Sequence, residues 1–345
     1  MKANIKSRKR DHVESARGCD VEYSISAGFD DVRFVHQPLP EMALDDADTE
    51  CRLFSKMVSA PIIILGMTGG YPQAEKINAK LAAAAEKEGL AFGLGSQRAM
   101  LEKPSLSSTY KVRKLAPTIP LIGNLGGCQL KKYGVKKVRE ALDIVDADAL
   151  AIHSNPLQEV CQPEGDHDFS GILSQIAIFA RDLGLPVIVK ETGAGMSMEA
   201  ALALRRAGVA MADVSGAGGT SWSKVEYMRS GKSPVFENWG NPTCVSIAAC
   251  SEMIETIGSG GVRNGLDAAK CLALGATYAG AALPFLRAKD AAKEAAAWKR
   301  DLKTAMLLTS SRNLWQLRSA RLIITGKTAE EMKRTGVDVN RYARR

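Results

Sequence analysis

From residue 60 onward, short apolar or β-branched runs alternate with longer segments in which small and apolar residues recur with helical periodicity. This alternation is typical of parallel strands joined by crossover helices. It predicts helices over stretches such as AEKINAKLAAAAEKEG, VKKVREALDIV, FSGILSQIAIFARDL, SMEAALALRRAG and GLDAAKCLALG. The eight predicted strands cover residues 61–67, 90–95, 120–125, 149–154, 186–191, 211–215, 254–258 and 276–283.

The predicted strands recur at intervals of roughly 30 residues, which matches a (β/α)8 TIM barrel better than a doubly wound sheet. We therefore predict an α/β fold in which residues 60–287 form the barrel core of a single domain spanning residues 1–345. Residues 1–59 would form an N-terminal extension, and residues 288–345 would add one or two C-terminal helices and a basic tail.

Two connections between the predicted elements are long, at residues 155–168 and 216–242, and both are expected to lack regular structure. Loops of this length in compact domains usually cover or bind something. Each of the two leaves the carboxyl end of a strand, which is the face where barrel enzymes place their chemistry. Both are therefore predicted to be functional.

Composition narrows the class of protein. Of the 345 residues, 46% are hydrophobic and 24% are charged, which excludes a disordered, collagenous or membrane-embedded chain. The start of the chain is charged and no apolar run reaches the length of a membrane-spanning helix, so we expect a cytoplasmic protein. Seven scattered cysteines without a C-x-x-C pair argue against a disulfide framework and against a structural zinc site.

The charge balance favours an anionic partner, because 46 Lys and Arg residues face 38 Asp and Glu residues, a net charge of +8. Basic runs at residues 6–10 and 341–345 are, by composition alone, expected to be solvated tails. Nucleic-acid binding would favour aromatic residues among them, and the two runs contain only Tyr342. The net charge alone does not choose among nucleic acid, a phosphorylated metabolite and acidic lipid, but the scarcity of aromatic residues in the basic runs makes nucleic acid a weak interpretation. We expect no nucleic acid and no membrane as partners.

Polar or glycine-rich residues follow almost every predicted strand. Because the carboxyl ends of the strands share one face of a barrel, these residues would form a ring. Such a ring indicates an active site more strongly than a single lysine or histidine does. In chain order the candidates are Met67, Thr68, Gly69, Ser96, Gln97, Arg98, Asn124, His153, Asn155, Gln158, Glu159, Lys190, Thr220, Gly260, Gly261, Arg263, Ala282 and Leu283.

Three parts of this ring suggest specific chemistry. The turn 258–263 would let backbone N–H groups and Arg263 approach a phosphate. Lys190 would place an ammonium group in the barrel mouth, where it could offset the charge of a cofactor ring, unless it pairs with Glu191 or another carboxylate. Glu159 fits a Mg²⁺ ion that keeps its waters and is shared with substrate phosphates, and a solvated loop carboxylate is the alternative.

Other motifs are missing or open to two interpretations. No complete G-x-G-x-x-G occurs, which disfavours a Rossmann domain, and no H-E-x-x-H occurs, which disfavours zinc catalysis. The connection 216–242 contains Trp222 and Glu226. These residues would either line the active-site pocket, where Glu226 would place a carboxylate, or belong to an exposed loop that contacts a neighbouring subunit.

Several short motifs occur together in this chain. They are Arg8-Lys9-x-Asp11-His12, Met67-Thr68-Gly69-Gly70, Gly95-Ser96-Gln97-Arg98, His153-x-Asn155-x-x-Gln158-Glu159, Gln162-Pro163-Glu164-Gly165, Val189-Lys190-Glu191 and Gly218-Gly219-Thr220-Ser221-Trp222. Taken jointly these motifs are highly specific. With them the chain closely resembles type 2 isopentenyl diphosphate isomerase, the flavin-dependent kind, from about residue 7 to residue 287.

The resemblance implies a barrel that binds FMN, requires Mg²⁺ and interconverts isopentenyl and dimethylallyl diphosphate by proton addition and elimination. Reduced FMN would act as the acid and base, NADPH would be its reductant, and the protein would be a homo-oligomer, either a tetramer or an octamer. Proton addition to an unactivated alkene creates cation-like character, so the reaction needs a dry pocket with negative charge nearby.

The resemblance also implies roles for individual residues. The FMN contacts would be Met67, Thr68, Gly69, Ser96, Asn124, Lys190, Thr220, Gly260, Gly261, Arg263, Ala282 and Leu283. The substrate contacts would be Arg8, Lys9, Ser96, Gln97, Arg98, His153, Asn155 and Gln158, with Glu159 holding the Mg²⁺ that bridges the diphosphate. The catalytic group would comprise Gln158, Lys190, Glu226 and His153.

Three other functions compete with this one. An FMN-dependent oxidoreductase of the 2-hydroxy acid oxidase type shares the barrel, but that family uses a histidine late in the barrel and none lies beyond His167. An enzyme similar to inosine-monophosphate dehydrogenase needs a cysteine after the sixth strand, and none lies between Cys161 and Cys244. An RNA-binding barrel without enzyme activity would depend only on the net charge and the basic tails.

Overall fold

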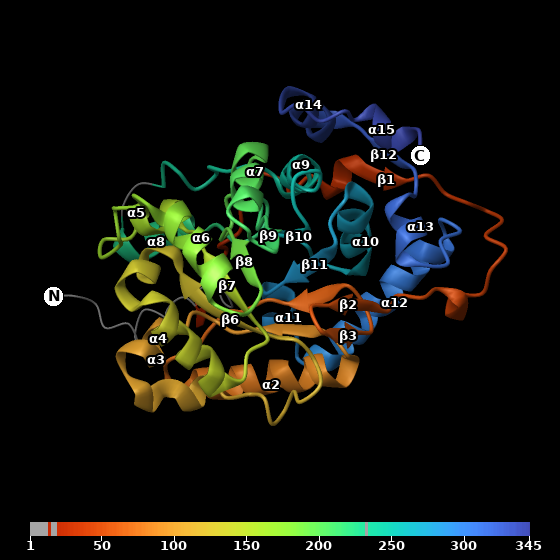
Figure 1. The fold of residues 1–345 in the computed structure, drawn as a ribbon. Helices are drawn as coiled ribbons and strands as arrows, with labels where there is room; N and C mark the ends of the chain where they lie inside the picture. The colour runs from red at the N-terminus through yellow and green to blue at the C-terminus, as the bar shows by residue number, and fades with distance from the viewer. Residues whose placement is uncertain (1–12, 15–18, 232–233) are drawn as a thin grey trace.

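The computed structural model describes residues 13–14, 19–231 and 234–345 (Figure 1). Eight parallel strands close into a barrel in the order β10-β11-β4-β5-β6-β7-β8-β9. The predicted (β/α)8 fold is therefore confirmed, and every predicted strand is present, seven in a shorter form and the third at its predicted length but shifted by one residue. The barrel strands are β4 (Ile62–Ile64), β5 (Ala91–Gly93), β6 (Leu121–Gly126), β7 (Ala149–His153), β8 (Val187–Lys190), β9 (Met211–Asp213), β10 (Thr256–Ser259) and β11 (Tyr278–Ala281).

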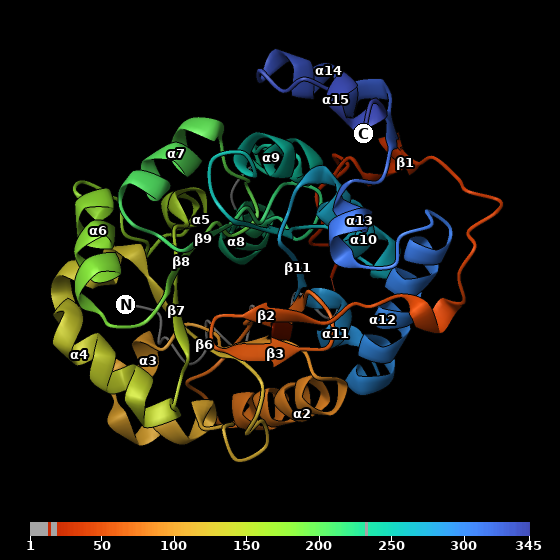
Figure 2. The same cartoon turned by 45° about the vertical axis from the view of Figure 1, so that its right-hand side comes forward.

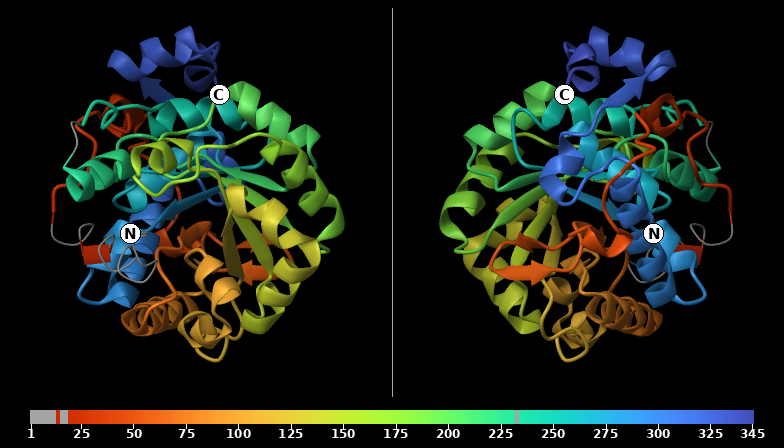
Figure 3. Two further views of the ribbon diagram at one scale, coloured as in Figure 1. Left: turned by 90° about the vertical axis from the view of Figure 1, so that its left-hand side faces the viewer. Right: turned by 90° about the vertical axis from the view of Figure 1, so that its right-hand side faces the viewer.

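Helices surround the barrel and cover the outer faces of its strands (Figure 3). Local sequence sets their ends: in the first of them Pro72 occupies the first turn and Gly89, at φ 65°, ends the helix. In chain order the helices that follow the barrel strands are α2 (Pro72–Glu88), α3 (Arg98–Glu102), α4 (Leu130–Val145), α5 (Pro156–Cys161), α6 (Ile172–Asp182), α7 (Met198–Arg206), α8 (Trp222–Ser230), α9 (Thr243–Cys250), α10 (Gly265–Leu274) and α11 (Leu283–Arg287). The 3-10 turns in the described part of the chain are η1 (Phe29–Asp31), η2 (Leu44–Asp46), η3 (Pro104–Tyr110) and η4 (Gly127–Gln129).

The two connections predicted to lack regular structure contain helices, so that prediction was wrong. The first contains α5 and the second contains α8. The sequence of α8, WSKVEYMRS, mixes polar and apolar residues without a clear apolar stripe, so periodicity does not reveal it. Its start is fixed instead by a cap, because Ser221 Oγ accepts a hydrogen bond from Lys224 N at 3.3 Å.

A hairpin of β2 (Cys51–Leu53) and β3 (Lys56–Val58) covers one end of the barrel (Figure 2). Leu53 and Val58 are buried in the cluster that fills the barrel interior, together with residues near the amino ends of the strands. Tyr278 Oη donates a hydrogen bond to Arg52 O at 2.6 Å, and Lys56 pairs with Asp148 at 2.9 Å. The hairpin therefore closes the amino end and leaves the carboxyl end of the barrel for the site.

The chain beyond the barrel is richer in structure than the predicted one or two helices, and that prediction was also wrong. It contains α12 (Ala291–Leu307), α13 (Leu314–Arg318), α14 (Gly326–Arg334) and α15 (Asn340–Ala343). A further strand, β12 (Leu322–Ile324), pairs antiparallel with β1 (Val32–Phe34) of the N-terminal extension. Sequence periodicity cannot reveal a pairing between segments so far apart in the chain.

The basic C-terminal run is docked on the protein and is not the expected solvated tail. Tyr342 is fully buried and its hydroxyl donates to Leu274 O at 3.0 Å. The guanidinium groups of Arg341 and Arg345 lie 4.7 and 4.5 Å from the centre of its ring. No helix in the described part of the chain is long and apolar enough to cross a membrane.

Candidate active site

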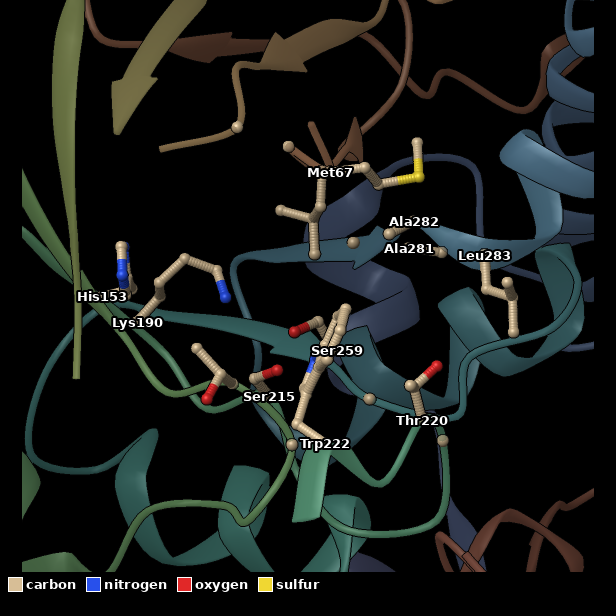
Figure 4. Close-up of a pocket in the computed structure, with 18 of the residues that line it drawn as sticks. Met67, His153, Lys190, Ser215, Thr220, Trp222, Ser259, Ala281, Ala282 and Leu283 are labelled. Atoms are coloured by element: carbon tan, nitrogen blue, oxygen red, sulfur yellow. The ribbon is translucent and has the colours of Figure 1, made fainter. Parts of the chain in front are cut away.

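A cavity of about 490 Å³ opens at the carboxyl ends of the barrel strands (Figure 4). This volume lies in the usual range of small-molecule sites. Most of the predicted ring lines it, so the strand ends do meet at one site. The predicted residues in its wall are Met67, Ser96, Arg98, Asn124, His153, Asn155, Gln158, Glu159, Lys190, Thr220, Trp222, Gly260, Gly261, Arg263, Ala282 and Leu283.

Figure 4 shows how these side chains are distributed. His153 and Lys190 lie at one end of the cavity, and Thr220 and Leu283 lie toward the other. The Trp222 side chain stands between the two ends. Four predicted residues, Thr68, Gly69, Gln97 and Glu226, are outside the lining, and the predicted Arg8 and Lys9 lie outside the described residues.

Gln97 is placed to support the site with its side chain. It is 2% exposed, and its Oε1 accepts a hydrogen bond from Asn124 N at 3.0 Å. Asn124 Oδ1 in turn lies 2.8 Å from His153 Nδ1. An amide oxygen only accepts, so this contact assigns the proton to Nδ1 of the imidazole. In this structure Gln97 is connected to the cavity wall through Asn124 and His153, and its predicted direct contact with a substrate stays a prediction.

Gly69 and Thr68 follow Met67 of the cavity wall but are not themselves part of the lining. A Cβ on Gly69 would lie 2.0 Å from the ring of Tyr110, so this glycine permits close packing of a tyrosine against the backbone. Thr68 is 1% exposed, and its Oγ1 has no hydrogen-bond partner among the described residues. A buried hydroxyl without a partner is costly, and such atoms in native proteins often await a ligand or water.

A chain of hydrogen-bonded polar groups, most of them buried, connects α5 with α8. Asn155 Nδ2 donates to Glu159 Oε1 at 3.0 Å and to Gln158 Oε1 at 3.2 Å. Gln158 Nε2 then donates to Glu226 Oε1 at 3.2 Å. Glu226 is fully buried and forms an ion pair with Arg229. Gln158 lines the cavity and Glu226 does not. The predicted carboxylate of Glu226 is therefore connected to the cavity by its hydrogen bond with Gln158.

Buried acids lie close to Lys190, which ends β8 next to His153 of β7. Burial raises the pKa of Asp213, while the Lys190 ammonium and the hydroxyl of Ser259 oppose that rise. Burial also raises the pKa of Glu191 to about 7, although its Oε2 accepts three backbone N–H bonds of 2.5–2.6 Å. Lys190 Nζ donates to the backbone oxygen of Glu191 at 2.6 Å, so the alternative pairing with the Glu191 carboxylate is not formed.

The end of the cavity near Leu283 is built from glycines. Gly260 and Gly261 adopt φ angles of 96° and 69°, which favour glycine. A Cβ on Gly260 would lie 2.2 Å from Gly216 O, and one on Gly219 would lie 2.4 Å from Gly261 N. The turns after β9 and β10 therefore pack backbone against backbone. Arg263 projects from the same region, just before Asn264 caps α10.

Two residues of the cavity wall, Gln162 and Ser215, are absent from the predicted contacts. Gln162 is 3% exposed, and its Nε2 is a second buried donor with no partner in the part of the chain described. The signal for it was its place in the Gln162-Pro163-Glu164-Gly165 motif. Ser215 lines the cavity with a φ of 38°, a conformation that a residue with a Cβ rarely adopts, and the sequence carries no signal for that angle.

The metal candidate Glu159 is 9% exposed and lies in the cavity wall. Its Oε1 is engaged by Asn155, and its Oε2 accepts from Asp166 N at 2.9 Å. Among the described residues, no three His, Cys, Asp or Glu side chains are grouped as metal ligands. A metal here would therefore need water or substrate oxygens as its remaining ligands, which suits Mg²⁺.

Comparison with known proteins agrees with this geometry. A family profile described as FMN-dependent dehydrogenase matches residues 167–324. The isopentenyl-diphosphate delta-isomerase of Methanothermobacter thermautotrophicus is 42% identical over 99% of both chains. The isopentenyl-diphosphate delta-isomerase of Pyrococcus horikoshii is 43% identical over 98% of this chain and 96% of its own.

Solved structures show the fold at a greater distance. A mandelate oxidase mutant with the C4a-OH-FMN adduct superposes with a TM-score of 0.64 over 92% of this chain and 99% of its own, at 16% identity. At that identity only the barrel is shared, whereas the relatives above match over nearly the whole length. The chain therefore belongs to the isopentenyl-diphosphate delta-isomerase family, in its flavin-dependent type 2 class.

Proposed function

We propose that this protein interconverts isopentenyl and dimethylallyl diphosphate in the cavity at the carboxyl end of the barrel, with FMN bound there. The observation that supports this most is the match of relatives named isopentenyl-diphosphate delta-isomerase over almost the entire chain, combined with a ring of polar strand ends around one cavity. The oxidase alternative lacks a comparable observation, because His153 on β7 is the sole histidine of the described residues in the lining.

The cavity fits a flavin. The orphaned hydroxyl of Thr68 offers a hydrogen-bonding group beside the wall, and the glycine turns at the Leu283 end leave room for a phosphate near Arg263. Lys190 supplies positive charge at the other end, where it would face the flavin ring. Reduced FMN would supply an electron-rich ring with an exchangeable proton.

The residues of this chain would hold the substrate and keep water away. Arg98 and Gln162 are donors in the cavity wall, and an anionic diphosphate would pair with them. Trp222 and Met67 would cover the apolar part of the substrate. The buried carboxylate of Glu226 would stabilise cation-like character in the alkene through its hydrogen bond to Gln158.

Glu159 would hold the Mg²⁺ that bridges the diphosphate. Replacing its carboxylate with an amide, Glu159→Gln, removes the charge that attracts the ion while keeping the bond from Asn155. We expect the Mg²⁺ concentration needed for half-maximal activity to rise at least about tenfold, since a charged ligand is lost. Unchanged metal dependence, measured in a Mg²⁺ titration, would remove Glu159 from this role.

NADPH is proposed as the reductant and the cytoplasm as the compartment, where the seven free cysteines would stay reduced. A tetramer or octamer is proposed as the assembly. Its support is a set of exposed apolar side chains next to α8, namely Val235, Phe236 and Trp239, which are 75%, 45% and 63% exposed.

An anaerobic assay tests the proposed activity. The protein is incubated with isopentenyl diphosphate, Mg²⁺ and FMN, once with the flavin reduced and once with it oxidised. We expect dimethylallyl diphosphate only in the reduced sample, with no stoichiometric consumption of reductant. Product in the oxidised sample alone, or consumption of one reductant per product, would indicate a redox enzyme instead.

A further inference from the structure

A segment that we call the N-terminal strap, residues 20–24, crosses the turn after β9 beside the cavity. Tyr23 N donates to Gly219 O at 2.9 Å, and Ser221 N donates to Val21 O at 2.8 Å. Lys224 Nζ adds a bond to Glu22 O at 3.1 Å. These bonds fix the backbone of the strap on both sides of Glu22.

The side chain of Glu22 lies in the cavity wall at the glycine end. One carboxylate oxygen pairs with Arg263, and the other lies 3.2 Å from Arg287 Nη1. All three residues line the cavity, together with Gly260 and Gly261. A carboxylate thus sits among the positive charges of the region where the flavin phosphate is proposed to bind.

We propose that Glu22 is an internal counter-ion of the phosphate site, which neutralises Arg263 and Arg287 in the flavin-free protein and is displaced from Arg263 when the phosphate of FMN enters. This inference rests on the proposed function, because it takes the flavin as the ligand. It assigns to the strap a role in setting cofactor affinity.

The negative charge of Glu22 is expected to lower the affinity for FMN. The phosphate of FMN and the Glu22 carboxylate are both negative, so they repel each other and compete for the same guanidinium group. The competition can be resolved locally. The side chains of Glu22, Arg263 and Arg287 are 28%, 52% and 38% exposed, and ion pairs this exposed are weak. The carboxylate can therefore rotate away while the backbone bonds of the strap remain.

The variant Glu22→Gln tests the proposal by removing the charge and keeping the size. Flavin-free protein is titrated with FMN and, separately, with riboflavin, which lacks the phosphate, and binding is followed by flavin fluorescence. We expect the Kd for FMN to fall roughly threefold to tenfold in the variant and the Kd for riboflavin to stay unchanged. The gain should shrink at high salt, which screens exposed charges.

Asp20→Asn is the matched control. Asp20 lies on the same strap, pairs with Lys224 at 3.0 Å and is outside the cavity lining, so its loss changes the charge of the strap without freeing an arginine. It should leave the ratio of the two Kd values as in the parent protein. A similar gain for FMN in this variant would show that general charge, and not the contact of Glu22, sets the affinity.

Three results would overturn the proposal. Weaker binding of FMN by Glu22→Gln would mean that the carboxylate positions Arg263 for the phosphate, and equal gains for FMN and riboflavin would mean that the phosphate is not involved. If Glu22→Gln tightened FMN binding just as much in a protein that also carries Arg263→Gln, competition for the Arg263 guanidinium group would be excluded. Failure of both flavins to bind the parent protein would contradict the proposed function as well, whereas FMN binding without isomerase activity would leave the Glu22 comparison intact.

Discussion

Thr68 and Gln162 are buried polar residues with unsatisfied atoms beside the same cavity. A buried hydroxyl or amide without a hydrogen bond costs about 1–3 kcal/mol. The folded chain bears this cost at two positions next to its candidate site. Buried polar atoms that lower the stability of the folded chain are expected at a site that binds a ligand, because the ligand can supply the missing hydrogen bonds.

The variant Thr68→Val separates the effect of the hydroxyl on stability from its effect on FMN binding, because valine has the shape of threonine without the hydroxyl. The flavin-free protein should keep its stability or gain up to about 1 kcal/mol, since an unsatisfied hydroxyl is removed from the interior. FMN binding should weaken about fivefold, as expected for the loss of one hydrogen bond. Urea denaturation and a flavin titration measure the two quantities. Unchanged FMN affinity would mean that this hydroxyl does not contact the flavin.

The sequence predicts which strand ends supply the site, but not which of two neighbours faces the cavity. Arg98 lines it, whereas Gln97 points to Asn124 N and Ala141 O. The same holds for Met67 in the wall and Thr68 outside it. The direction of a side chain after a strand depends on the path of the loop, which is set by packing such as that of Tyr110 against Gly69 and is not encoded in a short motif.

At the scale of elements, the site depends on two glycine turns that pack against each other. The turn after β10 approaches the turn after β9 so closely that added methyl groups at Gly260 and Gly261 would each lie under 3 Å from backbone atoms. Thr243 at the start of α9 strengthens this contact, since its Oγ1 donates to Gly260 O at 2.6 Å. The end of the cavity that we propose for the phosphate is therefore formed by close backbone packing.

The variant Gly260→Ala should disrupt both stability and cofactor binding. A residue with a Cβ is strained at a φ of 96°, and the methyl group would also meet Gly216, so we expect a loss of roughly 3 kcal/mol or more. Gly336→Ala is the control, because Gly336 has a φ of 85° but its added methyl group would have no atom within 4 Å, and this variant should cost about 1–2 kcal/mol.

Thermal unfolding and retention of FMN on gel filtration measure the outcome. Gly260→Ala should lose the flavin, while Gly336→Ala should retain it. Equal loss of stability in the two variants would show that backbone strain matters and that the contact between the turns does not.

The barrel strands can be predicted from the sequence, whereas helix α8 cannot. The barrel strands are buried apolar runs at regular intervals, and all eight are predicted because each carries its own signal. Helix α8 has no such stripe, and its residues are held by Ser221 and by contacts with the N-terminal strap. Elements that are stabilised by partners distant in the sequence are the ones that a local pattern misses.

At the scale of the whole molecule, a segment of the N-terminal extension and the C-terminal region pair with each other outside the barrel. Strand β12 from the C-terminal region pairs with β1 near the start, and Thr328 N donates to Asp31 Oδ2 at 3.0 Å. The last helix is anchored by Tyr342, which bonds the end of α10 through Leu274 O. This region lies on the outside of the barrel and away from the cavity wall, so it contributes stability and not chemistry.

The variant Tyr342→Ala should lower the stability of the protein without changing its affinity for FMN, whereas Thr68→Val should weaken FMN binding without lowering stability. It removes a fully buried ring and its hydrogen bond, which should cost about 3–5 kcal/mol in the free energy of unfolding. The Kd for FMN, measured below the unfolding temperature, should not change. A weakened FMN affinity in folded protein would show that the C-terminal region also shapes the site.

The most direct measurement of the central claim follows the hydrogen atoms of the substrate. Isopentenyl diphosphate is converted anaerobically in D₂O with Mg²⁺ and reduced FMN, the product is analysed by NMR, and the flavin absorbance is recorded throughout. Proton addition and removal in this cavity predict deuterium from solvent in the dimethylallyl diphosphate while the flavin stays reduced from start to finish. Product without deuterium, or oxidation of the flavin in step with turnover, would contradict it.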